Sequence, residues 1–380
     1  PLPQIQVGDV ADALWAMAGV ARAETGARIV GLTGSNGKTT VKEMLASILG
    51  RVGPTWWTRG NLNNELGVPL TLCRLNPEHR FAVIEMGANH HGEIRHLCGL
   101  VRPHVGLVTN AGAAHLEGFG SVRGVAEAKG EIYETLAPDA TAVINVDDHF
   151  AGYWLDRAAP RRCMSFSYKG PADVWAEDAG ADGGFMLRVG DASRWVNLPL
   201  PGRHNVMNAL AAATAATALG ASVRRIAEGL ESVRPVAGRL CWSRGKRGLR
   251  LLDDTYNANP NSLQVALDVL AAAPGPHWVV LGDMGELGDT AETLHGEAGE
   301  TIRRMGVARL FTTGPNAAAA ARAFGEGARH FENQQDLIGA LSSVVTGREA
   351  VLVKGSRSMV MERVVAGLQQ GADSAASGEG

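Results

Sequence analysis

The sequence predicts an α/β protein with two mostly parallel β-sheets, each covered by helices. From residue 28 onward, short aliphatic runs alternate with segments of helical periodicity, which is the pattern of parallel strands joined by helices. The alternation changes to short, glycine-broken segments between residues 163 and 200, and it resumes after residue 235. With 380 residues, the chain is long enough for two or three domains of ordinary size.

The expected elements of the first half follow in chain order. A short amphipathic helix within residues 1–25 is expected to be a linker or the remnant of an upstream domain. Strands are expected where aliphatic residues are densest, at 28–32, 81–86, 105–110 and 141–146. Helical periodicity indicates helices at 41–49, 122–136 and 205–219. The segments 185–189 and 195–198 suggest an antiparallel elaboration of this sheet.

A second α/β unit is expected after the helix-breaking segment Pro235 to Gly238. Its strands are predicted at 249–254, 278–282, 310–313 and 350–354, and the helices between them indicate a Rossmann-like arrangement. We therefore expect a central domain at 26–235 and a C-terminal domain at 236–370. Residues 371–380 are small and polar, which predicts a disordered tail.

Composition narrows the class of protein. Hydrophobic residues make up 45% of the chain and charged residues 20%, and the net charge is −3, as in soluble globular proteins that do not bind nucleic acid or membrane surfaces. Four cysteines lie far apart without metal-type spacing, as expected of reduced thiols in the cytoplasm. No apolar run approaches the roughly 20 residues that span a bilayer. The expected partners are small molecules.

The segment from Thr33 to Thr40, Thr-Gly-Ser-Asn-Gly-Lys-Thr-Thr, lies between a predicted strand and a predicted helix. Gly34 and Gly37 allow a tight turn that aims backbone N–H groups at one anion, and the helix adds its positive N-terminal end. Lys38 can neutralise phosphate oxygens, and the Thr39 hydroxyl can ligate Mg²⁺. The pattern predicts a nucleoside triphosphate site, although Leu32 stands where the common Walker pattern has glycine. A plain glycine turn with a surface lysine is the alternative.

Two further side chains follow predicted strands. Glu85 ends the strand at 81–86, and His115 follows the strand at 105–110. Ligands collect outside the carboxyl ends of parallel strands, so both residues are candidate metal ligands beside the phosphate loop. Glu85 could instead cap a turn, and a single histidine on a loop often has no special role.

Lys129 stands at an unexpected place in the helix predicted at 122–136. The apolar stripe of this helix includes Val125 and Ile132, and Lys129 lies four residues after Val125 on the same face. A buried amine loses its charge readily, and a neutral amine can act as a nucleophile or add carbon dioxide to give a carbamate. The alternative is a lysine whose stem covers the core while its ammonium reaches water.

Two asparagine-rich segments, 60–69 and 253–260, lie where loops meet strand ends. Asparagine clusters are usually turns. Uncharged amide donors also suit a site that orients a carboxylate without trapping it as a permanent ion pair.

Together these motifs resemble those of the Mur ligases, ATP-dependent amide-forming enzymes of cytoplasmic peptidoglycan synthesis. The resemblance runs from about residue 28 to 368 and rests on three further motifs: Asn-Asn-Glu-Leu-Gly-Val-Pro at 63–69, Tyr-Asn-Ala-Asn-Pro at 256–260 and Gly-Asp-Met-Gly-Glu-Leu-Gly at 282–288. It implies a central P-loop ATP-binding domain and a C-terminal Rossmann-like domain. Among family members, these motifs are most similar to those of the enzyme that adds D-alanyl-D-alanine to UDP-N-acetylmuramoyl-tripeptide. The Asp-Asn-Pro-Arg motif of the diaminopimelate-adding relative is absent.

The resemblance implies roles for individual residues. Thr33, Gly34, Ser35, Asn36, Gly37, Lys38, Thr39 and Thr40 would bind ATP together with Asn208, Arg239 and Asp254. Thr39 and Glu85 would hold one Mg²⁺, and His115 with a carbamylated Lys129 would hold a second. Lys38, Lys129, His115, Asn63 and Asn64 would be catalytic. Tyr256, Asn257, Asn259, Lys354, Ser356 and Arg357 would contact substrate.

The resemblance also implies a cytoplasmic enzyme, which we expect to be a monomer. The family's N-terminal UDP-binding domain has no counterpart here beyond residues 1–25, so we expect weaker binding of the UDP-linked substrate than in a longer chain. Two alternatives stay open at this stage. One is another ligase of this type, such as a folylpolyglutamate synthetase, and the other is a P-loop nucleotidase that works as a switch or motor.

Overall fold

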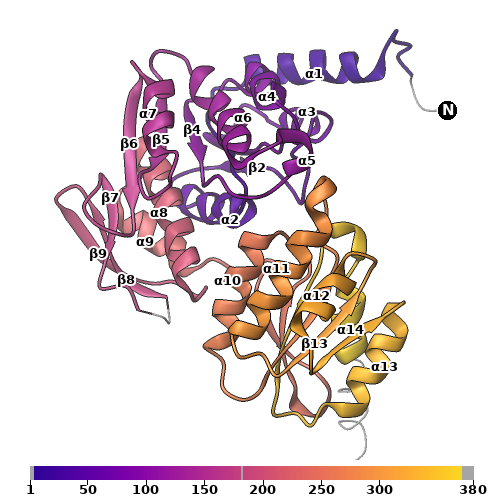
Figure 1. Cartoon of the computed structure of the whole chain (residues 1–380). Helices are drawn as coiled ribbons and strands as arrows, with labels where there is room; N and C mark the ends of the chain where they lie inside the picture. The colour runs from indigo at the N-terminus through magenta and orange to yellow at the C-terminus, as the bar shows by residue number, and fades with distance from the viewer. Residues whose placement is uncertain (1–3, 181–182, 370–380) are drawn as a thin grey trace, which may run out of the picture. The chain divides into compact units, whose positions relative to one another are not determined.

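The computed structural model describes residues 4–180 and 183–369, so the tail predicted at 371–380 lies outside the described residues. The chain divides into two units (Figure 1). The first contains residues 1–112 and 118–234, and the second contains 113–117 and 235–380. Each unit is built around one sheet, and no described helix is long and apolar enough to cross a membrane.

The first unit has a nine-stranded sheet in the order β2-β3-β1-β4-β5-β6-β7-β8-β9. All pairs from β2 to β7 are parallel, and β7, β8 and β9 pair antiparallel. The strands are β1 (Arg28–Thr33), β2 (Thr55–Trp57), β3 (Phe81–Glu85), β4 (Val105–Val108), β5 (Thr141–Asn145), β6 (Arg162–Ser167), β7 (Val174–Glu177), β8 (Gly184–Val189) and β9 (Ala192–Asn197). The four strands expected from aliphatic density are β1, β3, β4 and β5.

The antiparallel elaboration predicted for 163–200 is right for β7 to β9 and wrong for β6. β6 joins β5 in parallel, with Thr141 opposite Arg162, and β7 joins β6 in parallel. The sheet therefore continues without a break into the later strands. The core on one face of this sheet is a cluster that includes residues of β1, β6 and β8.

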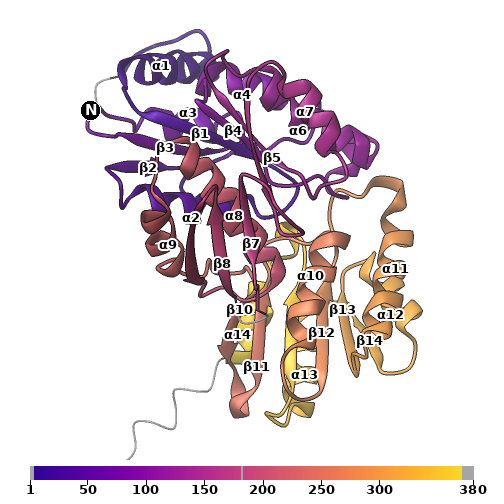
Figure 2. The ribbon, with the colours of Figure 1, turned by 90° about the vertical axis from the view of Figure 1, so that its left-hand side faces the viewer.

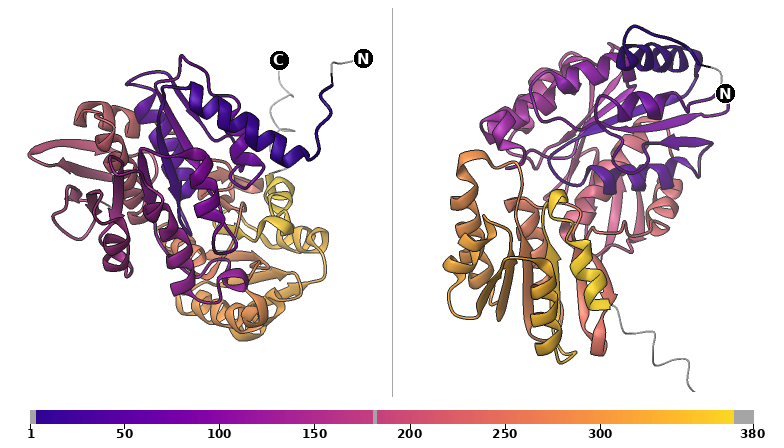
Figure 3. Two further views of the ribbon diagram at one scale, coloured as in Figure 1. Left: turned by 90° about the horizontal axis from the view of Figure 1, so that it is seen from above. Right: turned by 90° about the vertical axis from the view of Figure 1, so that its right-hand side faces the viewer.

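Nine helices are described between residues 10 and 231: α1 (Val10–Glu24), α2 (Lys38–Leu49), α3 (Gly67–Leu72), α4 (Glu93–Val101), α5 (Leu116–Phe119), α6 (Val122–Glu134), α7 (Ala151–Ala158), α8 (Arg203–Ala218) and α9 (Val223–Glu231). α1 packs against α3 and α4 (Figure 3). α6 begins where the Ser121 side chain accepts a hydrogen bond from the Gly124 N–H, at 3.1 Å, which satisfies one of the free donors at the helix start.

Helix α2 follows the phosphate loop and packs against α8 and α9 (Figure 2). The contact with α9 is close, because a Cβ added to Gly229 would lie 2.5 Å from the Ile48 Cα. The Ser47 hydroxyl donates to the Gly229 carbonyl at 2.8 Å. The helix that carries Lys38 and Thr39 is thus held in place by its contact with α9.

The second unit has a six-stranded sheet in the order β10-β11-β15-β12-β13-β14, in which only the β10–β11 pair is antiparallel. Its strands are β10 (Cys241–Arg244), β11 (Arg250–Asp254), β12 (His277–Gly282), β13 (Arg309–Thr313), β14 (Ala328–Phe331) and β15 (Ala350–Lys354). Its helices are α10 (Pro260–Ala271), α11 (Ala291–Arg304), α12 (Ala317–Phe324), α13 (Gln334–Val344) and α14 (Glu362–Gln369), with short 3₁₀ turns at Lys246–Gly248, Gly288–Thr290 and Arg357–Met359.

Side chains of this sheet alternate between two cores, as strand geometry requires. Leu252 and Leu281 pack into the core that contains residues of α10, α11 and α12. Leu251 and Val280 pack into the opposite core with residues of α13 and α14. Helices therefore cover both faces of a mainly parallel sheet, which is the predicted Rossmann-like arrangement.

Candidate functional site

The phosphate loop joins β1 to α2, and both of its glycines are required by geometry. Gly34 has φ +149° and Gly37 has φ +80°, a range that side-chain-bearing residues rarely adopt. A Cβ on Gly34 would lie 1.8 Å from the Thr109 hydroxyl oxygen, and a Cβ on Gly37 would lie 2.3 Å from the Asn208 Oδ1. The loop thus has the shape of a phosphate cradle at the N-terminus of a 12-residue helix.

Within the loop, the Lys38 ammonium donates to the Gly34 carbonyl at 2.7 Å, which holds the cation over the turn. Asn208 of α8 lies next to Gly37, and its amide nitrogen is 3.4 Å from the Asn205 Oδ1. The predicted nucleotide contact from α8 is therefore adjacent to the predicted phosphate contact. Thr40 lies in the first turn of α2.

The segment after β4 holds the loop from the other side. The Thr109 hydroxyl and the Asn110 amide both donate to the Asn36 carbonyl, at 2.7 and 3.1 Å. The Asn36 N–H donates to Asn110 Oδ1 at 3.0 Å, and Ser35 exchanges hydrogen bonds with Gly112. Sequence analysis did not select Thr109 or Asn110 for the site. The signal was present, since both stand at the carboxyl end of the strand predicted at 105–110.

Glu85 ends β3 and is only 2% exposed. The Thr39 hydroxyl donates to its carboxylate at 3.1 Å and the Asn63 amide at 2.8 Å. The Lys42 ammonium lies 3.6 Å from the same carboxylate. The structure thus brings together three predicted residues, Thr39, Glu85 and Asn63. It adds Lys42, which sequence analysis missed.

These oxygen donors fit a hard divalent cation, because Mg²⁺ prefers carboxylate, hydroxyl, phosphate and water oxygens. Throughout residues 4–180 and 183–369, no group of three or more His, Cys, Asp or Glu side chains is placed to hold a metal. A cation at Thr39 and Glu85 would therefore need further ligands from phosphate or water.

Lys129 of α6 is completely buried, so its ammonium does not reach water as in the alternative that the sequence left open. Its Nζ has no hydrogen-bond partner in the described part of the chain, and it lies 5.5 Å from the centre of the Phe119 ring. Burial lowers the pKa of this amine well below its usual value, the nearby Lys38 charge lowers it further, and Glu93 opposes the shift. The amine is accordingly disposed to be neutral. Neutral amines are the form that adds carbon dioxide, so the residue fits the expected carbamate.

His115 belongs to the short segment 113–117 that groups with the second unit. Its Nδ1 pairs with the Glu286 carboxylate of the 282–288 motif. The predicted metal-binding role of His115 stays a prediction. Glu286 was not selected as a site residue, although its motif was recognised.

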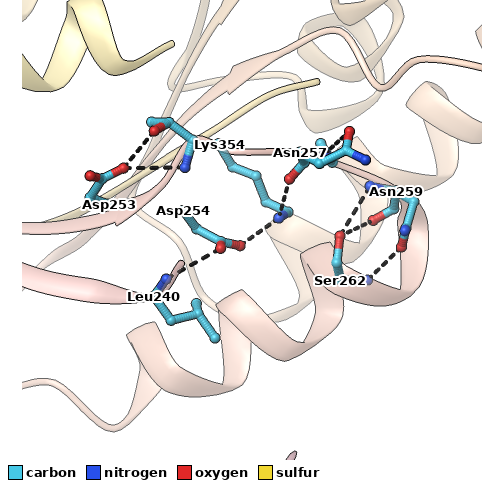
Figure 4. A network of polar contacts seen from close by, with 9 residues as sticks. Leu240, Asp253, Asp254, Asn257, Asn259, Ser262 and Lys354 are labelled. Carbon is cyan, nitrogen blue, oxygen red and sulfur yellow. Dashed lines mark hydrogen bonds and ion pairs between the residues drawn. The ribbon is translucent and has the colours of Figure 1, made fainter. Parts of the chain in front are cut away.

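In the second unit, the predicted residues Asp254 and Lys354 bind each other at the ends of β11 and β15 (Figure 4). The Lys354 ammonium also donates to the Asn257 carbonyl at 2.9 Å. Lys354 is 1% exposed, so its ammonium is compensated by these partners and not by water. The pair fixes the start of the asparagine segment against the sheet.

The other predicted residues of the second unit make contacts of their own within it. The Arg239 guanidinium lies 4.1 Å from the centre of the Tyr256 ring. Asn259 caps α10 through a reciprocal pair of hydrogen bonds with Ser262. The Ser356 N–H donates to the Asp283 carbonyl at 2.8 Å, and Arg357 pairs with Glu362 at 2.8 Å.

Comparisons with known proteins agree with this geometry. Residues 32–216 match the Mur ligase middle domain, and residues 238–357 match the Mur ligase glutamate ligase domain. The chain is 43% identical to the UDP-N-acetylmuramoyl-tripeptide--D-alanyl-D-alanine ligase of Escherichia coli K12, over 97% of this chain and 83% of that protein. The chain belongs to the Mur ligase family.

One more relative and two solved structures are also similar to this Mur ligase over most of its length. The Haemophilus influenzae protein described by the same name is 39% identical, over 97% of this chain and 82% of that one. A crystal structure of MurF from Acinetobacter baumannii superposes with a TM-score of 0.91 at 38% identity, covering 97% and 83% of the two chains. A Thermotoga maritima MurF structure in complex with ADP gives 0.84 at 29% identity, covering 96% and 84%.

Two more predicted residues of the first unit have defined places in this Mur ligase. Thr33 is buried at the end of β1, and Asn64 accepts a hydrogen bond from the Gly67 N–H at 2.9 Å at the start of α3.

In the second unit a hollow of about 620 Å³ lies beside the end of β13 and the start of α13. Arg363 and Glu332 are among its lining residues, and sequence analysis selected none of them.

Proposed function

We propose that this chain is an ATP-dependent ligase that forms the amide bond between UDP-N-acetylmuramoyl-tripeptide and D-alanyl-D-alanine. It would act in the synthesis of the peptidoglycan precursor. The observation that carries the proposal is the phosphate cradle with Thr39 and Glu85 beside it, in a chain that is 43% identical to a ligase of this name over nearly its whole length.

The chemistry follows from what the cradle can bind. ATP would place its triphosphate on the backbone N–H groups of the loop and on the N-terminus of α2, with Lys38 at the terminal oxygens. The γ-phosphoryl group passes to the tripeptide's terminal carboxylate, giving an acyl phosphate and ADP. The amine of D-alanyl-D-alanine then attacks the acyl carbon, and phosphate leaves. Lys38 stabilises the charge that develops on the transferred oxygens.

Mg²⁺ is the expected cation, and it would neutralise the phosphate oxygens when bound. Thr39 and Glu85 would hold it, because they offer a hydroxyl and a carboxylate within 3.1 Å of each other. For a second Mg²⁺ we propose a carbamate on Lys129 as a ligand, a role supported by the buried amine, which has no hydrogen-bond partner among the described residues. Asn63 would hold the Glu85 carboxylate in place, since it donates to it at 2.8 Å. We also propose that the enzyme works as a cytoplasmic monomer.

The test is ATP-dependent phosphate release with each nucleotide-linked peptide and each amino acceptor in turn, with the product identified by mass. We expect release only when UDP-N-acetylmuramoyl-tripeptide and D-alanyl-D-alanine are both present. Lys169 is exposed, so Lys169→Ala serves as a matched control for Lys38→Ala and should keep full activity.

Other outcomes would identify the alternatives. Release with a folate as the carboxylate substrate and glutamate as the amino acceptor would indicate a folylpolyglutamate synthetase. Release that needs no acceptor would indicate a nucleotidase that works as a switch or motor. Either result would overturn the proposal.

A further inference from the structure

Three lysines of the described chain are almost completely buried, and their ammonium groups differ in the polar contacts that they make. Lys354 pairs with Asp254, and Lys129 has no hydrogen-bond partner among the described residues. Lys42 is 0% exposed and contacts two carboxylates and one carbonyl. Burying an ammonium costs several kcal/mol of solvation before its partners offset the cost. The contacts of Lys42 show which groups compensate the charge of its ammonium.

Lys42 lies one helical turn after Lys38 on α2, and its ammonium links three segments. It is 3.6 Å from a Glu85 carboxylate oxygen at the end of β3. It is 3.3 Å from Glu43, its neighbour on α2, and Glu43 also accepts from the Trp57 indole N–H at 3.2 Å. The third contact is a hydrogen bond of 3.2 Å to the Gly60 carbonyl. One cation therefore joins α2, β3 and the loop after β2.

That loop, residues 60–64, is called the asparagine loop here. Four of its five residues are exposed, and only Asn63 is half-buried. Its described anchors to the interior are few. Gly60 accepts from Lys42, the Asn63 amide donates to Glu85, and the Asn63 carbonyl accepts from the Gly87 N–H at 2.8 Å. Glu85 and Lys42 thus hold the loop at two points, and they also contact each other.

We propose that Lys42 is a positioning residue that fixes the asparagine loop and the Glu85 carboxylate to each other beside the phosphate loop. The ammonium holds the loop at Gly60 and orients the carboxylate that Asn63 and Thr39 also contact. A neutral side chain of the same length would fill the space without either link. The functional part of this inference rests on the proposed ligase reaction, and the structural part does not.

The first test measures hydrogen exchange in Lys42→Met. The reporters are the Asn63 N–H, which donates to the Asn61 carbonyl at 2.8 Å, and the Gly67 N–H, which donates to Asn64 Oδ1 at 2.9 Å. We expect both to exchange about tenfold faster or more, as after loss of a hydrogen bond to a charged group. The amides of α8 should keep their protection. Lys169→Met, which removes an exposed ammonium, is the control and should leave all of these rates unchanged.

A neutral pair keeps the test valid if Lys42→Met alone fails to fold. Lys42→Met combined with Glu85→Gln removes both charges, while glutamine can still accept from Asn63. We expect faster exchange at Asn63 and Gly67 in this variant too, since Gly60 has lost its donor. Wild-type exchange rates at both amides in either folded variant would overturn the inference.

The second test separates positioning from a general structural effect. Lys42→Met and Asn63→Ala should each lower kcat for phosphate release by about tenfold or more, and the combined variant should fall no further. KM for ATP should stay within about twofold of the wild-type value in Lys42→Met, because the phosphate cradle keeps its own contacts. Losses that multiply would show that Lys42 does not act through the loop. If no acceptor supports turnover in the wild type, the ligase proposal fails while the exchange result still decides the role of Lys42.

Discussion

Replacing Lys129 with methionine should make the first unit more stable and the enzyme inactive. The Lys129 amine is completely buried without a hydrogen-bond partner in the described structure, so it lowers the stability of the fold. Burying a polar group in this way costs about 1–3 kcal/mol by mutational data. Methionine has a similar volume and no such cost. At about 2–4 °C per kcal/mol for a unit of this size, Lys129→Met should melt about 2–12 °C higher.

The gain should also depend on pH, with a sign that follows from the lowered pKa. Between that lowered pKa and 10.5, the unfolded lysine binds a proton that the folded one does not. Wild-type stability therefore rises with pH across this window, and the advantage of Lys129→Met is largest at its acid end and shrinks as pH approaches 10.5. The measurement is urea unfolding of both proteins from pH 6 to 10 in buffer freed of carbon dioxide.

The same prediction covers ligase activity, which should depend on the Lys129 side chain and on carbon dioxide. Lys129→Met should not support ligation, and wild-type activity should rise when bicarbonate is added to carbon-dioxide-free enzyme. Lys129→Arg should be equally inactive, because a guanidinium cannot carry a carbamate and would repel a cation. A methionine variant that is less stable than the wild type at every pH would refute the reasoning about the buried amine. An active arginine variant would refute the carbamate.

Three further perturbations test other parts of the two units. Lys38→Ala should lower kcat by about 10²–10³-fold with an unchanged melting temperature, since the charge on the transferred phosphoryl group loses its main protein cation; unaltered turnover would remove the phosphate-loop assignment. Gly37→Ala should cost about 1–2 kcal/mol of stability from its left-handed backbone and should weaken ATP binding, measured by calorimetry, because the new Cβ displaces Asn208. Lys354→Met should destabilise the second unit by about 3–5 kcal/mol in urea unfolding, and adding Asp254→Asn should restore much of that loss by neutralising the carboxylate left behind; equal stabilities of the single and double variants would contradict this.

Much of the fold was predictable because parallel strands in a covered sheet are continuous aliphatic runs. β1, β3, β5 and β15 are of this kind, and all but one of their residues are buried. β2 was missed because three half-buried residues carry no period. β10 and β14 were missed because edge strands are short and partly exposed. The parallel pairing of β6 could not be read from the sequence, since period and composition do not specify the partner of a strand.

The site was predictable where chemistry and backbone geometry coincide. Gly34, Lys38 and Glu85 were selected as candidates because a phosphate turn and a strand end favour those residue types. Lys42 was missed because a lysine on a helix is normally taken as exposed, and its pairing with Glu85 depends on two segments 43 positions apart in the chain. The Lys354–Asp254 pair was predicted as two separate residues for the same reason.

The packing of α2 between the sheet and α9 determines how nucleotide binding affects the thermal stability of the first unit. α2 has little room to move, because Gly229 abuts Ile48 and buried apolar residues of α2 belong to one hydrophobic cluster that also contains residues of β7, β8 and β9. Energy gained at the loop is therefore shared by a single cooperative block. At a ligand concentration of 100 Kd this gain is about 2.7 kcal/mol. In a calorimetric scan with ATP, the whole transition of the first unit should move upward as one peak, out to the meander of β7, β8 and β9, which lies far along the sheet from the strand that leads into the loop.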